Sequence, residues 1–123
     1  MNLLLLALAG AAGTLSRYGL SLWTYQWLGS QFPYGTLLVN ILGCFAIGLV
    51  GTLADERLIL TSPIRLLLIV GFLGAFTTFS SFTYDAWILL KSGEFLRVGL
   101  NIFGTLIGCF IGLIAGVSLG RTF

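Results

Sequence analysis

Residues 71–82 combine four hydroxyl side chains with two glycines in the middle of an apolar stretch long enough to cross a lipid bilayer. The hydroxyl groups belong to Thr77, Thr78, Ser80 and Ser81. At membrane depth, an irregular segment is tolerated only where it is buried in protein or lines a polar cavity. This run is therefore the predicted working site, and neutral hydroxyl groups are the chemistry that it offers.

Two aromatic rings and one carboxamide extend this set. Phe79 and Phe82 are three residues apart, so a helix places both rings on one side. Their positively polarised edges favour a small anion without a formal charge that would trap it. Asn40 shares a helix face with Thr36 and Gly43, and its two N–H donors suit a partly dehydrated anion. Two alternatives stay open: the rings fit an ordinary core, and Asn40 fits an interhelical hydrogen bond.

The last and first apolar stretches add three polar candidates. Asn101 and Thr105 are four residues apart near the start of the last stretch, where anion contact and interhelical hydrogen bonding are both possible roles. Arg17 lies roughly 24 Å along the first stretch at about 1.5 Å per residue, which predicts a place near the membrane surface. There it either raises the local anion concentration at a pore mouth or extends to the lipid headgroups.

Missing residue types narrow the function. The sequence has no histidine, which removes the usual general base and the commonest metal ligand. No nucleophile–base pair or metal cluster can be assembled from the other residues, so we do not expect an enzyme. Cys44 and Cys109 are interpreted as small packing residues, with a disulfide or a metal site as the alternative. A net charge of +2 gives no reason to expect a nucleic-acid partner.

Composition and length define the elements that must hold these residues. Of 123 residues, 58% are hydrophobic and 8% are charged, against roughly 25% charged residues in a soluble domain. We predict an all-α membrane protein, with one integral-membrane domain over residues 1–123 and four spans at about 2–28, 34–54, 63–90 and 95–120. The third span is predicted to break near its middle, and Ser62 is predicted to cap its start before Pro63.

The basic residues are divided equally between the two sides of such a bundle. They are Arg57, Arg65 and Arg121 on one side, and Arg17, Lys91 and Arg97 on the other. Equal numbers give the positive-inside rule no preference, which predicts insertion in both directions and an antiparallel, dual-topology homodimer. A single orientation fixed by folding or by a partner is the alternative. In the dimer, two helix breaks near the bilayer centre can direct carbonyl oxygens at one shared cation.

Glycines recur every four residues along the fourth span, at Gly104, Gly108, Gly112, Gly116 and Gly120. This spacing places them in a stripe along one helix face. Small residues on such a face let helix backbones approach closely in lipid. We interpret the stripe as tight packing within or between subunits, without a chemical role.

Three segments together resemble the CrcB/Fluc family of fluoride channels: residues 10–18, 35–43 and 74–82. They occur in the family's order, in a chain of the family's length with four spans. The resemblance implies a passive channel in the bacterial inner membrane that exports toxic fluoride from the cytoplasm. It also implies a dual-topology homodimer, formed with an inverted copy, that contains two fluoride pores.

The same resemblance implies a fluoride path through the middle of the chain. The path would be lined by Asn40, Phe79 and Phe82, with supporting hydroxyl groups from Ser80 and Thr36. The fourth span departs from the family pattern: many members carry a tyrosine and a serine at the positions that match Asn101 and Thr105. Thr105 keeps a hydroxyl group and therefore stays a candidate for the path.

Two further roles are implied by the resemblance. A structural Na⁺ at the dimer centre would be held by main-chain carbonyls of Gly74 and Thr77 from both subunits. Arg17 matches the arginine of the family's first motif and would belong to the vestibule.

A small dual-topology, proton-coupled multidrug antiporter is the alternative function, because its size and charge balance match equally well. Its mechanism needs a titratable carboxylate within the first span, and residues 2–28 contain no acid. Of the four acidic residues only Asp85 lies at any depth, in the third span. A membrane scaffold without transport activity would explain the glycine stripe but would leave the hydroxyl-rich segment unexplained.

Overall fold

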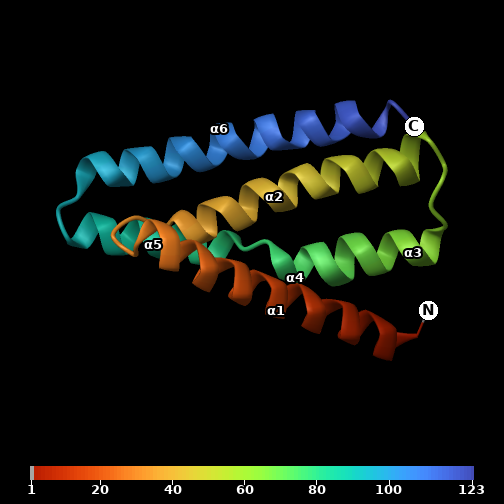
Figure 1. Ribbon diagram of the computed structural model, residues 1–123, viewed down its shortest axis with the longest axis horizontal. Coiled ribbons are helices and arrows are strands. Elements are labelled where there is room, and N and C mark those ends of the chain that lie inside the picture. Colours follow the sequence, from red (N-terminus) through yellow and green to blue (C-terminus); the bar gives the residue numbers. More distant parts are fainter. Residues whose placement is uncertain (1) are drawn as a thin grey trace.

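The computed structural model describes residues 2–123, and every regular element in that range is helical (Figure 1). The elements are α1 (Leu3–Leu28), α2 (Tyr34–Gly51), α3 (Ser62–Leu66), α4 (Gly74–Phe76), α5 (Phe79–Lys91) and α6 (Phe95–Gly120), with π-helical segments η1 (Thr52–Glu56) and η2 (Leu67–Leu73). They form four spans long and apolar enough to cross a membrane: Leu3–Leu28, Tyr34–Glu56, Ser62–Lys91 and Phe95–Gly120. The predicted all-α architecture with four spans is confirmed.

Local sequence explains where the spans begin and end. The Asn2 side chain accepts a hydrogen bond from the Leu4 N–H at 2.8 Å and caps α1. Gly29 ends α1 with a φ of 81°, a conformation open to glycine at little steric cost. The prediction that Ser62 caps the third span is wrong by one residue. Thr61 has the extended backbone of a cap and Ser62 is already helical; proline tolerates this shift because its fixed φ suits the first helical turn.

α6 packs along α2 through its glycines, and the two helices lie side by side (Figure 1). A Cβ atom added to Gly112 would lie 2.9 Å from the Ile41 carbonyl oxygen, closer than real side chains approach. Gly108 and Gly116 meet α2 in the same way, and Gly120 lies against Thr52 of η1 and Leu49 of α2. Gly104 has open space at its Cα. Four of the five glycines in the stripe therefore close the contact between two helices of one chain.

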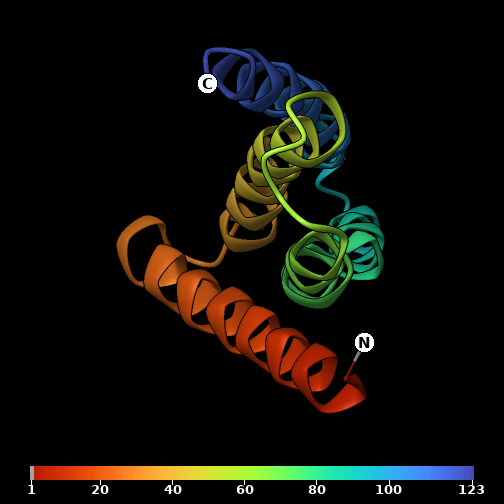
Figure 2. The same cartoon turned by 90° about the vertical axis from the view of Figure 1, so that its right-hand side faces the viewer.

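α1 lies on the opposite side of the bundle from α6 and crosses the third span at an angle (Figure 2). The crossing uses small residues: a Cβ atom added to Gly71 would lie 2.8 Å from the Ala9 Cβ. Large apolar side chains of α1 remain exposed, with Leu3 at 77% and Leu15 at 71%. Such a surface suits lipid or another subunit.

The start of α1, the C-terminal end of the chain and the loop between α2 and α3 all lie at the same end of the bundle (Figure 1). Arg65 pairs with Asp55 and Arg121 pairs with Glu56, each at 2.8 Å. The Glu56 carboxylate accepts a hydrogen bond from Arg121 and raises the pKa of that guanidinium. These ion pairs are exposed, so water screens them and they contribute little to stability.

Candidate functional site

The third span loses its helical backbone at two residues. α4 ends at Phe76, and Thr77 (φ −84°, ψ 159°) and Thr78 (φ −153°, ψ 113°) are extended before α5 begins at Phe79. The Thr78 hydroxyl accepts a hydrogen bond from the Ser81 N–H at 3.2 Å and caps α5. Two adjacent β-branched residues, the second of them at a favoured capping position, explain why the interruption falls here.

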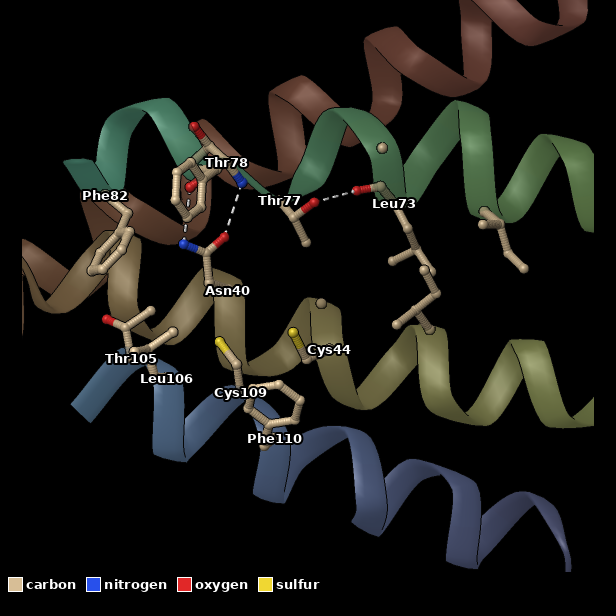
Figure 3. A pocket seen from close by; sticks show the side chains of 15 residues that line it. Asn40, Cys44, Leu73, Thr77, Thr78, Phe82, Thr105, Leu106, Cys109 and Phe110 are labelled. Carbon is tan, nitrogen blue, oxygen red and sulfur yellow. Dashed lines mark hydrogen bonds between the residues drawn. The ribbon is translucent and has the colours of Figure 1, made fainter. Parts of the chain in front are cut away.

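The extended Thr78 backbone pairs with the side chain of Asn40 on α2 (Figure 3). The Asn40 Oδ1 accepts from the Thr78 N–H at 2.9 Å, and the Nδ2 donates to the Thr78 carbonyl at 3.0 Å. Asn40 itself is buried. The interhelical hydrogen bond that the sequence left open for Asn40 is therefore confirmed. It uses one of the two N–H groups of the carboxamide.

This pairing redirects the backbone hydrogen bonds of the break. In an uninterrupted helix the Thr78 N–H would donate to the Gly74 carbonyl, but here it donates to Asn40. The Ala75 carbonyl accepts from the Arg17 Nε at 3.1 Å. Arg17, predicted to lie near the membrane surface, thus extends its guanidinium to the break. Helical side chains point toward the N-terminus of their helix, and the long arginine stem adds to that reach.

A cavity of about 340 Å³ lies beside the break, between α2, the third span and α6 (Figure 3). Its lining includes the predicted path residues Asn40, Phe79, Phe82 and Thr105, together with Gly74 and Thr77. Within residues 2–123, no charged side chain contributes to this lining. The polar side chains of this first cavity are therefore neutral carboxamide, hydroxyl and thiol groups.

Phe79 and Phe82 form an edge-to-face pair on one side of α5. Their ring centroids are 5.6 Å apart and their planes meet at 62°, an arrangement that aromatic quadrupoles favour. Phe82 is 7% exposed, whereas Phe79 is 73% exposed. One ring is therefore held by the bundle, and the other faces the surroundings of the chain.

Thr105 brings an unpaired hydroxyl to the first cavity. The side chain is buried, and its Oγ1 has no hydrogen-bond partner in the described part of the chain. An unsatisfied buried polar group costs about 1–3 kcal/mol, so a hydrogen-bond partner for this hydroxyl would stabilise the protein. Asn101, one turn earlier, is also buried with an unpaired Nδ2, but it does not line the cavity.

A second cavity, of about 400 Å³, also borders the break. Arg17, Thr36 and Asp85 line it, and Thr78 lines both cavities. The predicted path residues are thus divided, because Thr36 lies in the second cavity. Ser80 is exposed and lines neither of the two, although its hydroxyl lies 3.5 Å from that of Thr78.

The prediction of site residues missed two that line the first cavity, Cys44 and Cys109. Both are half-buried, and neither is in a disulfide. Their spacing could have identified them. Cys44 follows Asn40, and Cys109 follows Thr105, by four residues, or about one helical turn, which places each cysteine on the same helix face as a predicted site residue. The interpretation of these cysteines as packing residues is therefore incomplete, because both also face the cavity.

Comparison with known proteins gives a consistent result. The family model described as CrcB-like protein, Camphor Resistance (CrcB) matches residues 4–117. A protein of Chloroflexus aurantiacus named Fluoride-specific ion channel FluC is 48% identical over 122 residues, which cover 99% of this chain and 97% of that protein. Proteins of the same name are 50% identical over 117 residues in Solidesulfovibrio magneticus (94% and 93% covered) and 41% identical over 120 residues in Geobacter sulfurreducens (98% and 97% covered). The chain belongs to the CrcB family.

Proposed function

We propose that this integral membrane protein is a passive, fluoride-selective ion channel that exports fluoride from the cytoplasm. Its bacterial relatives carry the name of a fluoride-specific channel, and its four spans are long enough to cross a membrane. The observation that carries the proposal is the first cavity. Neutral donors and aromatic rings line it beside an interrupted span, with no charged side chain from residues 2–123.

An anion that enters this cavity loses water and needs other donors. Asn40 offers its second N–H, and a small rotation of Thr105 would offer a buried hydroxyl that has no partner within residues 2–123. The ring edges of Phe79 and Phe82 add weakly positive C–H groups. Because two hydrogen bonds to Thr78 fix the carboxamide, Asn40 needs no reorganisation when the ion arrives. Neutral donors of this kind bind an anion and still release it, which conduction requires.

General chemistry accounts for the selectivity for fluoride over chloride and for the outward direction of the flow. Fluoride is smaller than chloride and accepts stronger hydrogen bonds, but it also loses more hydration free energy. N–H and O–H donors favour it only where they are spaced closely enough to replace the lost water. The negative-inside membrane potential drives an anion outward, so no coupled ion is needed. We assign the second cavity to the vestibule, where Arg17 raises the local anion concentration. Thr36 and Ser80 place further hydroxyl groups near Thr78, which borders both cavities.

We further propose that the channel is an antiparallel homodimer with an inverted copy of the chain, containing two pores. The equal number of basic residues on the two sides supports dual topology. The 73% exposure of Phe79 in the single chain supports a second subunit that completes the path around this ring.

The break fits the structural Na⁺ that such a dimer would hold at its centre. The Gly74 carbonyl lacks its usual helical donor because the Thr78 N–H is bonded to Asn40. Main-chain oxygens of interrupted membrane helices are suitable ligands for sodium. Gly74 and Thr77 of both subunits would hold the ion, which would supply a fixed positive charge to the dimer.

A proton-coupled drug antiporter has less support. α1 carries no acidic residue, and the one acid deep in a span, Asp85, is half-buried in the second cavity rather than the first. An antiporter would also require alternating access to a carboxylate, and the first cavity has none.

A growth assay tests the proposed function in cells. Bacteria lacking their own fluoride exporter are transformed with this chain or with Asn40→Asp and grown in sodium fluoride at mildly acidic pH. The wild-type chain should restore growth, and the variant should not. Growth of wild-type transformants no better than that of an empty-vector strain, despite protein in the membrane, would contradict the proposal.

A further inference from the structure

Cys44 of α2 and Cys109 of α6 line the same wall of the first cavity (Figure 3). Their helices are held in close contact, because Gly108 and Gly112 sit against Ile41. Figure 3 shows the sulfur atoms of both residues turned toward this cavity. They are the only cysteines of the sequence, and they are not joined by a disulfide.

The thiols form a layer next to the one that contains the proposed fluoride donors. Cys44 follows Asn40, and Cys109 follows Thr105, by four residues, which is about 6 Å along each helix. Figure 3 shows the two sulfur atoms and the Asn40 and Thr105 side chains around the same space. A ligand held by both sulfurs would therefore stand beside the Asn40–Thr105 layer.

The chemistry of a two-thiol site selects a particular class of cation. Thiolate sulfur is a soft ligand and prefers soft metals. A zinc site needs four ligands, and residues 2–123 contain no cluster of three or more histidine, cysteine or acidic side chains. A d¹⁰ cation such as Hg²⁺ is satisfied by two sulfurs in a line. Its complex with two thiolates is neutral, which suits an apolar cavity where a net charge would be costly.

We propose that Cys44 and Cys109 form a two-thiol site for one soft, two-coordinate cation of the mercuric class, and that its occupation closes the fluoride path. When both sulfurs bind Hg²⁺, each thiol loses one proton to water, so one cation and two thiols give one neutral bis-thiolate complex and two protons. No electrons are transferred. The closure rests on the proposed channel function, whereas the binding does not.

Binding is measured on the purified full-length chain titrated with mercuric chloride and followed by the ultraviolet absorption of the mercury–thiolate bond. We expect saturation at one Hg²⁺ per chain, and a denatured mass equal to one chain plus one mercury minus two protons. Cys44→Ala and Cys109→Ala should each bind at least 100-fold more weakly in competition with a small monothiol. Saturation at two Hg²⁺ per chain, one on each independent thiol, would overturn the proposal. This stoichiometry is measured on the wild-type chain, so the result does not depend on whether a variant folds.

Closure is measured as fluoride efflux from liposomes before and after one equivalent of Hg²⁺, with Zn²⁺ as the matched control cation. We expect at least a tenfold lower rate with Hg²⁺, recovery on addition of excess dithiol, and no change with Zn²⁺. The single-cysteine variants, compared with their own metal-free rates, should resist closure. Stoichiometric binding with an unchanged rate would refute closure. A wild-type protein that releases no fluoride before metal is added would instead refute the channel function, and the titration would still decide the site.

Discussion

Replacement of Asn40 by aspartate tests the fluoride path with almost no change in shape. The Asn40 Nδ2 donates to the Thr78 carbonyl at 3.0 Å, and the Oδ1 accepts from the Thr78 N–H at 2.9 Å. In Asn40→Asp the second contact survives, but a carboxylate oxygen replaces the donor and faces a carbonyl oxygen. The variant therefore removes the N–H offered to fluoride and places a negative charge at the cavity wall.

The size of the effect follows from Coulomb's law. Two like unit charges about 4 Å apart repel by about 4 kcal/mol at an effective dielectric constant of about 20. Since each 1.36 kcal/mol is tenfold in rate, Asn40→Asp should lower fluoride flux about 1,000-fold. Asn40→Ala removes the donor without adding charge. A hydrogen bond to a charged group contributes about 1.5–3 kcal/mol, so this variant should lose only about 10- to 150-fold.

Fluoride efflux from liposomes of equal protein content gives this ranking directly, after size-exclusion chromatography has shown that each variant assembles as the wild type does. Thr24→Ala is the matched control. Thr24 is 1% exposed and donates to the Leu20 carbonyl at 2.7 Å, but it lines neither cavity, so flux should stay at the wild-type level. If Asn40→Asp conducts as fast as Asn40→Ala, the anion does not pass beside Asn40, and the path is wrong.

Three further substitutions test separate parts of the site. Phe82→Ile should lower fluoride efflux about two- to tenfold without loss of assembly, because it removes the ring edge offered to the anion, and an aromatic edge contact contributes about 0.5–1.5 kcal/mol. Phe103→Ile, at a 64% exposed position, is the control, and equal rates in both would remove Phe82 from the path. Gly112→Ala should destabilise the bundle by about 1–3 kcal/mol through overpacking and lower its thermal unfolding midpoint in detergent. Gly104→Ala should leave the midpoint unchanged, since a Cβ atom added there meets nothing. The same midpoint for both variants would count against the contact between α2 and α6. Thr78→Val keeps a β-branched side chain but removes the α5 cap, at a cost of about 1 kcal/mol. Its thermal unfolding midpoint should fall below that of the control Thr83→Val, whose hydroxyl lies on the exposed surface. A midpoint no lower than that of the control would show that the cap contributes nothing.

The spans and their tight contact could be predicted because both depend on local patterns. Apolar length alone defines four spans, and a four-residue repeat such as Gly108–Gly112–Gly116 identifies a packing face whichever helix it meets. Which helix it meets depends on the tertiary structure. The sequence left open contact within or between subunits, and the structure places four of the glycines against α2 of the same chain.

The details of the site depend on contacts between distant residues, which periodicity does not encode. Asn40 and Thr78 are 38 residues apart, and only the fold shows that the carboxamide completes the hydrogen bonds of an extended segment. Arg17 was placed by counting along a helix, and the count ignores the reach of its side chain back to Ala75. The sequence pattern places Thr36 and Asn40 on one helix face. In the structure they line different cavities, and Thr78 lies at the boundary between the two.

Selective, uncoupled fluoride conduction is the central claim, and efflux from liposomes of the purified protein tests it most directly. The vesicles are loaded with potassium fluoride and potassium chloride, and both anions are followed with ion-selective electrodes. Rapid fluoride release that begins only when a potassium ionophore is added, with chloride retained, is the predicted result. Release of both anions, or no fluoride release from correctly folded protein, would contradict it.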